Sequence, residues 1–309
     1  MPVLNKPPNR RFQFSLRALF GVMTLSAFVL ALIVPGPIRA VARQLVRARL
    51  SEYGVYISMH EVREHITVGR ARITESEFNP LMPSIARWFR VRKVGFTGSG
   101  LGDAATSELY RFGDDLEELS FADTRVTDEG LRALADLGYL IRIDLTNTAV
   151  TDEGLEILSA HTRLGSLQLT GTKITDQGMT HLSHLSELSV LTMARTAVSD
   201  AGLAHLEGLT NLDELDLDDT GVSDAGLAHL KRLARLRELR LQRTGVTDAG
   251  LKSLLGHKEL HFLFLDGTGV SWKGVNELRE HLPQTFVFYA DQVIDPWSKI
   301  GEVRSSTGP

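Results

Sequence analysis

The sequence contains no cysteine, and this absence excludes disulfide bonds, thiol nucleophiles and thiolate metal sites. Acidic residues are absent from residues 1–49, which have a formal charge of +8 from Lys6, Arg10, Arg11, Arg17, Arg39, Arg43, Arg47 and Arg49. The remaining residues hold 26 of the 34 basic side chains and all 38 acidic ones, a formal charge of −12. A region this acidic is a poor candidate for nucleic-acid binding.

A unit of 24 residues recurs without any insertion between copies, and seven copies cover over half of the chain. Its first leucine stands at Leu116, Leu140, Leu164, Leu188, Leu212, Leu236 and Leu260. Self-similarity at such a period predicts a solenoid, in which each unit buries its apolar face against its neighbours only. Residues 91–115 fit the same template as a worn copy of 25 residues, so we predict repeats over residues 91–282.

The first half of each unit predicts a short strand. In the unit that begins at Leu212, Leu215 and Leu217 alternate with polar residues, so their side chains point to one face. One strand from each unit gives a parallel sheet that lines the inner side of the solenoid. Thr220, which recurs in every copy, follows at the point where the chain turns, and its hydroxyl can bond backbone groups that the turn leaves unpaired.

The second half of each unit predicts a short helix on the outer side. Thr or Ser followed by Asp, as in Ser223-Asp224, is a helix N-cap with a carboxylate at the positive end of the helix dipole. Leucines then follow at helical spacing, for example Leu227, Leu230 and Leu233. They predict two turns of helix with one buried stripe.

The consensus L-x-x-L-x-L-x-x-T-x-V-T/S-D-x-G-L-x-x-L-x-x-L resembles a leucine-rich repeat of the cysteine-containing subclass, with Thr in place of the usual Cys or Asn. The resemblance implies an α/β leucine-rich repeat solenoid, or horseshoe, with an inner parallel β-sheet and outer short helices. It implies little about activity, because one fold serves many functions.

An uncharged run at residues 18–34, followed by Pro35-Gly36-Pro37, predicts one N-terminal transmembrane helix within an anchor at residues 18–37. A signal peptide cleaved near Ala42 and a buried core helix are the alternatives. A basic leader at residues 1–17 precedes the anchor, and the stretch R-F-Q-F-S-L-R-A-L at residues 11–19 resembles the R-F-S-L-R-x-L-L leaders of bacterial single-pass, membrane-anchored leucine-rich repeat proteins. That resemblance implies a cytoplasmic N-terminus with the repeats outside, or a secreted protein if the leader is cleaved.

The regions that flank the repeats predict caps. Residues 38–90 predict an arginine-rich amphipathic helix over 38–50 and then an N-terminal cap, with strands over 55–59 and 66–73. Trp88 and Phe89 are predicted to close the end of the core. Residues 283–309 predict a cap strand over 286–289 and then a loose tail.

Two histidine patterns resemble metal sites, but their residue spacing does not fit metal binding. His60 and His65 are five residues apart, which does not place both rings on one helix face as a zinc-protease motif requires. His181, His205 and His229 recur at repeat spacing and predict solvated positions on the outer helices. We therefore predict no catalytic residues, no metal and no cofactor, although a triad assembled in space would leave no signature in the sequence.

The inner face of the sheet is the predicted binding surface, because its residues vary between copies while the core leucines do not. Arg195, Asp219 and Arg243 are predicted to alternate as a charge ladder, and Asp216 to face Arg240. As an alternative, the charged residues form surface ion pairs with one another and bind no partner. The phenylalanines could instead pack under the C-terminal cap with Trp272. The predicted partner-binding residues are Arg142, Asp144, Gln168, Thr192, Arg195, Asp216, Asp218, Asp219, Arg240, Arg243, Phe262 and Phe264.

These observations favour a non-enzymatic, membrane-tethered scaffold whose concave face binds a protein or peptide. One alternative is a structural array that associates with copies of itself. Another is a substrate-recruiting module similar to the repeat halves of F-box ubiquitin-ligase adaptors, although no F-box-like helical segment precedes the repeats. An enzyme has no supporting motif.

Overall fold

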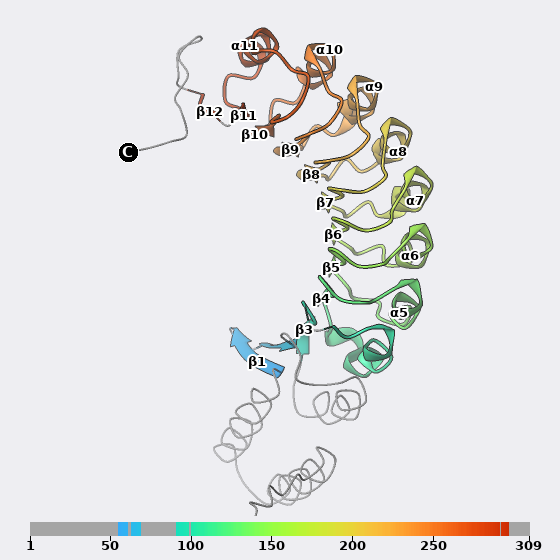
Figure 1. Ribbon diagram of the computed structural model, residues 1–309. Coiled ribbons are helices and arrows are strands. Elements are labelled where there is room, and N and C mark those ends of the chain that lie inside the picture. Colours follow the sequence, from blue (N-terminus) through green and yellow to red (C-terminus); the bar gives the residue numbers. More distant parts are fainter. Residues whose placement is uncertain (1–54, 61–62, 69–90, 99, 291, 297–309) are drawn as a thin grey trace, which may run out of the picture.

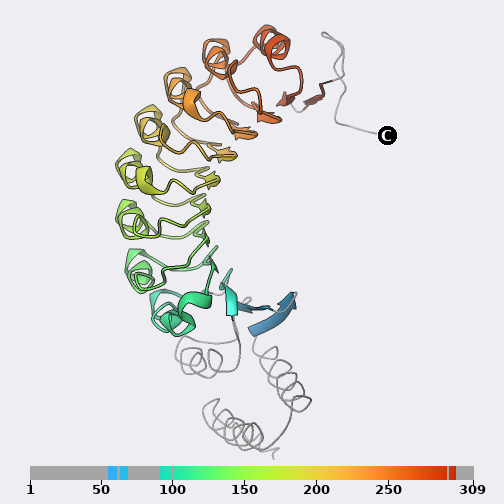
Figure 2. The same cartoon turned by 180° about the vertical axis from the view of Figure 1, so that it is seen from behind.

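The chain winds into a curved solenoid, with short strands along the inner edge and helices along the outer edge (Figures 1 and 2). The computed structural model describes residues 55–60, 63–68, 91–98, 100–290 and 292–296, the first two ranges by their backbone alone. The predicted α/β solenoid with an inner, mostly parallel sheet is confirmed.

One twelve-stranded sheet, with its strands in chain order, runs through the described residues. Neighbouring strands are parallel from β2 to β11, whereas β1–β2 and β11–β12 are antiparallel and close the two ends. Ile66 was the predicted start of the second cap strand, but β2 begins at Arg63, and β12 adds a further strand beyond the predicted one at 286–289. The strands are β1 (Val55–His60), β2 (Arg63–Val68), β3 (Val91–Gly95), β4 (Glu118–Ser120), β5 (Arg142–Asp144), β6 (Ser166–Gln168), β7 (Val190–Thr192), β8 (Glu214–Asp216), β9 (Glu238–Arg240), β10 (Phe262–Phe264), β11 (Phe286–Tyr289) and β12 (Gln292–Ile294).

Among the described residues, five of the seven outer α-helices are shorter than the two turns predicted, whereas the helices at Asp152–Leu158 and Trp272–His281 have seven and ten residues. In the four coils whose helices begin at Asp176, Asp200, Asp224 and Asp248, a single α-helical turn continues as a 3-10 helix, which advances about 2.0 Å per residue instead of 1.5 Å and so crosses the outer edge with fewer residues. The helices are η2 (Asp103–Ala105), η3 (Leu109–Asp115), α5 (Asp128–Arg132), α6 (Asp152–Leu158), α7 (Asp176–Met179), η4 (Thr180–His184), α8 (Asp200–Leu203), η5 (Ala204–Leu206), α9 (Asp224–Leu227), η6 (Ala228–Arg232), α10 (Asp248–Leu251), η7 (Lys252–Leu254) and α11 (Trp272–His281).

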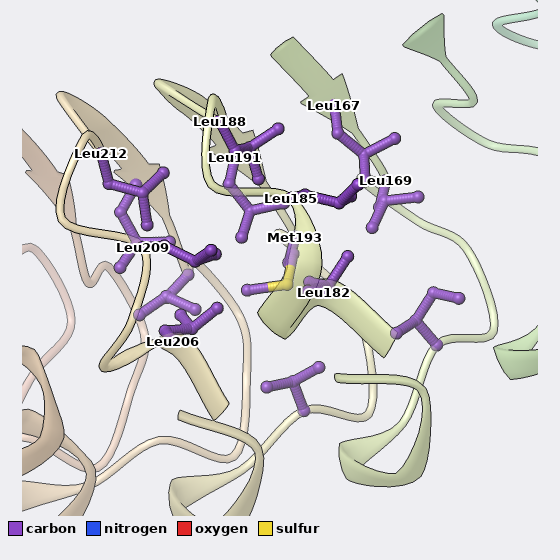
Figure 3. Packing of buried hydrophobic residues seen from close by; sticks show 14 of the residues in the cluster. Leu167, Leu169, Leu182, Leu185, Leu188, Leu191, Met193, Leu206, Leu209 and Leu212 are labelled. Carbon is purple, nitrogen blue, oxygen red and sulfur yellow. The ribbon is translucent and has the colours of Figure 1, made fainter. Parts of the chain in front are cut away.

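The core is a column of leucines between the sheet and the helices. Leu191 from β7, and Leu182 and Leu185 from the outer segment that precedes β7, point into this space (Figure 3), and all three are fully buried. Because each coil supplies the same positions, one continuous apolar cluster extends from Val91 to Ile294. The predicted inward direction of the strand leucines is confirmed.

A carboxylate joins each coil to the next. Asp200 illustrates the contact: its Oδ1 accepts the backbone N–H of Ser223 at 2.7 Å and its Oδ2 accepts the Ser223 hydroxyl at 2.6 Å. The same pair of bonds recurs from Asp103–Thr127 to Asp248–Ser271. These aspartates therefore do more than cap their own helix, because they also hold the cap residue of the following coil in place.

The recurring threonine of the turn is satisfied within its own coil. Thr220 is buried, and its hydroxyl donates to the carbonyl of Leu217 at 2.6 Å. Equivalent bonds fix Thr124, Thr148, Thr172, Thr196, Thr244 and Thr268. The hydroxyl thus closes the turn that leads the chain away from the sheet, as the sequence pattern predicts.

Several predicted features lie outside the described residues. They are the leader at 1–17, the anchor at 18–37, the helix at 38–50, Trp88, Phe89 and the tail from 297 onward. Within the part of the chain that the structure describes, no helix has the length and apolar character needed to cross a bilayer.

Candidate partner-binding surface

The concave face carries the side chains that flank each buried strand leucine. In β8, Leu215 points into the core while Glu214 and Asp216 remain half-buried on the opposite face. Because the strands are parallel and in register, equivalent residues form columns across the sheet. Eight predicted binding residues occupy such strand positions on this face: Arg142, Asp144, Gln168, Thr192, Asp216, Arg240, Phe262 and Phe264.

Arg195, Asp219 and Arg243 do not form the continuous ladder that was predicted. Arg243 donates from Nε and Nη2 to the two carboxylate oxygens of Asp219, each at 2.5 Å, and this contact lowers the pKa of Asp219. Arg195 instead donates to Oδ1 of Asn147 at 3.2 Å, two coils away. It can reach that far because Gly171, in the intervening coil, has no side chain.

The same column has an unusual backbone conformation. Asp123, Asn147, Arg195, Asp219 and Arg243 all have φ between 54° and 56°, in the left-handed region that favours glycine. Two other coils do place glycine at this position. Arginine in this region costs on the order of 1 kcal/mol of backbone strain, so the polar side chains are retained at a cost in stability.

Asp216 and Arg240 are in register on β8 and β9, as predicted, but they do not form the strongest local pair. The Arg240 guanidinium bonds Oε1 of Glu238 from both Nε and Nη2 at 2.7 Å. Its Cζ also lies 4.5 Å from the ring centroid of Phe264, which is cation–π geometry. Asp216 instead accepts the backbone N–H of Asp218 at 3.0 Å.

Asp218 is the one predicted binding residue that is buried, with 8% of its surface exposed. Its Oδ1 accepts the backbone N–H of Gln242 at 2.6 Å, so the carboxylate ties its own coil to the next. Burial, followed by repulsion from Asp216, raises the pKa of Asp218 to about 6. We therefore assign Asp218 to the scaffold beneath the surface rather than to partner contact.

Four phenylalanines form an aromatic shelf at the C-terminal end of the concave face. Phe262 stacks on Phe286 with ring centroids 5.6 Å apart, and Phe264 stacks on Phe288 at 4.2 Å. Phe262 remains 39% exposed. Trp272, the alternative packing partner, contacts Tyr289 instead, at 6.4 Å.

Sequence reasoning missed half of this aromatic shelf. Phe286 and Phe288 lie beyond the last recognisable unit, yet each is 24 residues after its stacking partner. Extending the repeat period past the end of the consensus would have placed both in the same columns as Phe262 and Phe264. The register of β10 with β11 confirms that placement.

A cavity of about 510 Å³ opens beside the aromatic shelf, and we call it the β8–β10 pocket. Glu214 lies in it without a hydrogen bond or ion pair to any side chain in the described part of the chain. Burial, with a further contribution from Glu238, raises the pKa of Glu214. The lining residues are Asp213, Glu214, Arg237, Glu238, Glu259, His261 and Phe262.

The histidines singled out in the sequence do not gather at this surface. His229 is half-buried on the outer side, where its Nδ1 lies 2.9 Å from Glu207 Oε1. His60 and His65 fall on two antiparallel strands, β1 and β2, rather than on one helix. Among the described residues, no three side chains are arranged to hold a metal ion.

Comparisons with known proteins agree with this architecture. A sequence model described as "Leucine Rich repeat" matches residues 115–135 and 235–255. The structure is similar to that of an internalin (inlF) from Listeria monocytogenes, with 16% identity and a TM-score of 0.52 over 73% of this chain and 86% of that one. It is also similar to internalin C2 (inlC2) from the same organism, with 22% identity and a TM-score of 0.54 over 71% and 84%. No curated protein matches the sequence. At these identities the likeness shows the fold alone.

Proposed function

We propose that this leucine-rich repeat solenoid is a non-enzymatic scaffold, tethered to a membrane through residues 18–37, that binds a protein or peptide partner with its concave face. The observation that carries the proposal is the aromatic shelf on an open sheet face, with the Arg240 guanidinium over the ring of Phe264. Exposed aromatic groups beside arginine are typical anchors of protein interfaces.

Two further observations support the concave face. Phe262 is exposed and the other three rings of the shelf are partly exposed, and burying such grouped apolar side chains against another molecule removes apolar area from water. The strained turns add to this, since Arg195 and Arg243 occupy positions where glycine would fit without strain. Residues with a strained backbone conformation are common at binding sites, where the side chain has a role that glycine could not fill.

Affinity capture with the full-length chain in mild detergent tests the proposal. The parent is compared with a concave-face variant that carries Asp216→Asn, Arg240→Gln and Phe264→Ala. A matched outer-face variant carries Glu156→Gln, Lys231→Gln and Tyr110→Ala, which removes one acid, one base and one exposed aromatic ring elsewhere. Circular dichroism melts establish first that all three proteins are folded.

A partner held by the parent and the outer-face variant, but lost by the concave-face variant, supports the proposal once the purified partner reproduces the difference. Equal capture by all three proteins would contradict it. Self-association that depends on concentration and disappears with Phe264→Ala would indicate a structural array instead. The membrane tether is tested separately, by whether the chain sediments with membranes and is released by detergent but not by high salt.

A further inference from the structure

The β8–β10 pocket has an excess of negative charge. Four carboxylates line it, together with Arg237 and one histidine. Arg237 approaches Asp213 at 3.5 Å, and Glu238 is bonded by Arg240. Glu214 and Glu259 have no ion pair with any side chain among the residues described.

Glu214 and Glu238 stand directly opposite each other in the paired strands β8 and β9. Like charges in this relation are destabilising. Burial and then Glu238 raise the pKa of Glu214, and Arg240 offsets only part of this effect. A cation from a partner would offset the repulsion between Glu214 and Glu238. An uncharged group would leave that repulsion unchanged, and an acidic group would increase it.

The aromatic shelf continues the same column. Glu238 on β9 is in register with Phe262 on β10, and Phe262 is in register with Phe286 on β11. Phe262 also lines the pocket, so the acidic pocket and the aromatic shelf are continuous. The surface therefore presents carboxylates and aromatic faces side by side.

Building on the proposed function, we infer that the partner presents a Lys or Arg side chain to the β8–β10 pocket and an aromatic or large aliphatic side chain to the aromatic shelf. Charge complementarity favours the cation, and a guanidinium or ammonium at the pocket rim also meets the Phe262 ring. The apolar group covers area that is otherwise open to water.

The spacing of the strands restricts the sequence of such a partner. Neighbouring strands lie about 4.8 Å apart, so carboxylates and aromatic rings one or two strands apart are separated by roughly 5 to 10 Å. An extended peptide advances about 3.3 Å per residue. The basic and apolar side chains are therefore expected two or three residues apart in the partner.

A second copy of the chain is a poorer occupant. Residues 50–309 carry a formal charge of −12, so two copies of this part of the chain repel each other on average. The partner we infer is consequently a different polypeptide, or a basic segment of one.

Selection from a random twelve-residue peptide library displayed on phage tests this inference against the full-length chain in detergent. Enriched peptides are synthesised and their dissociation constants measured by fluorescence anisotropy. The variants are Glu214→Gln and Phe262→Ala, with Glu156→Gln as the matched control, because it makes the same chemical change on exposed outer surface.

Enriched peptides should carry Lys or Arg two or three residues from an aromatic or large aliphatic residue. Glu214→Gln and Phe262→Ala should each weaken binding about three- to tenfold, and Glu156→Gln should not. High salt should weaken binding to the parent more than to Glu214→Gln.

Enrichment of neutral or acidic peptides, or of none, would overturn the inference, as would equal affinity for Glu214→Gln and Glu156→Gln. A further outcome is that the parent selects peptides that lack a basic residue and that the concave-face variant fails to bind. That result would support the proposed function but would contradict the inference that the partner presents a cation. Basic-aromatic peptides that the concave-face variant binds unchanged would overturn the proposed function itself. Dimerisation of the parent that Phe262→Ala abolishes would identify a second copy as the occupant.

Discussion

Asp218 shows how a single side chain can sit on a binding face and still belong to the scaffold. Its position after Leu217 predicts exposure on the concave side, and the sequence pattern cannot distinguish it from Asp216. In the structure the carboxylate turns toward the backbone of the next coil and is almost fully covered. The difference arises from side-chain direction in the turn, which a strand alternation does not encode.

The raised pKa of Asp218 predicts how stability depends on pH. Its folded-state pKa, about 6, lies above its ordinary value of 3.8, so this side chain favours folding below pH 3.8 and loses that contribution as the pH rises through 6. Asp218→Asn keeps an oxygen that accepts the Gln242 N–H but cannot ionise. We expect the variant to be more stable than the parent at pH 8, by on the order of 1 kcal/mol, and its advantage to be smaller at pH 5 and to vanish only below pH 3.8.

Urea unfolding at the two pH values measures this difference. Asp219→Asn is the control, because the Arg243 contact lowers the pKa of Asp219 and removal of that charge should not stabilise the protein. If Asp218→Asn lowered stability equally at pH 5 and pH 8, the buried carboxylate would be favourable in its ionised form.

At the scale of one coil, the link between carboxylate and cap residue determines which residue can follow it. A Cβ atom at Gly226 would stand 2.4 Å from Oδ1 of Asp200. That oxygen cannot simply move away, because it accepts the Ser223 N–H. The repeated Asp-x-Gly pattern therefore records a contact between coils, whereas sequence reasoning assigned the aspartate only to its own helix.

Gly226→Ala is therefore expected to destabilise the protein by about 1–3 kcal/mol through overpacking, even though alanine favours helix by about 1 kcal/mol over glycine. Gly208→Ala is the matched control. Nothing lies within 4 Å of a Cβ atom built there and its φ is not positive, so we expect no loss of stability. Thermal melts of the two variants measure the contrast, and equal melting temperatures would show that Asp200 shifts without cost.

The elements themselves were predictable to different degrees. Strands and the leucine core follow from a period that repeats without insertion, so their positions are fixed by alternation alone. The extent of the α-helices cannot be predicted from this period, because the same leucine spacing suits both an α-helical turn and the 3-10 segment that follows it. The cap strand β12 has no repeat signal and was missed.

At the scale of the whole array, the described core runs from end to end instead of gathering at one centre, since each coil packs only against its neighbours. Leu215, in the middle of the array, is fully buried between two such coils. Leu215→Ala should therefore cost about 2–5 kcal/mol through lost burial and a cavity. Lys231→Ala, an exposed outer-face change, should stay within about 0.5 kcal/mol.

Urea melts of these two variants test this prediction, and coincidence of the Leu215→Ala curve with the parent would contradict the inward direction of the strand leucines. A broadened transition would indicate that the two halves of the array unfold separately.

The candidate site was predictable in location but not in detail. Repeat spacing gives the columns of the concave face, and with them the positions of Phe262 and Phe264. It does not predict that Arg240 bonds Glu238 instead of Asp216, or that Arg195 bonds Asn147 across Gly171. Both contacts depend on side-chain rotamers. The pocket beside the aromatic shelf depends on three coils at once and has no signature in any one of them.

Each coil is bonded to the next through an Asp carboxylate and a Thr or Ser. The 24-residue unit is therefore the smallest piece of chain that can be gained or lost without leaving one of these polar groups unsatisfied. A unit duplicated whole brings its own Asp and its own Thr or Ser, so every link finds its counterpart. A deletion that removed only one of the two groups would leave the other without its counterpart. Descendants of such a chain can therefore change the length of the inner surface only in steps of one strand, about 4.8 Å, and the span of the partner sets how many steps are useful.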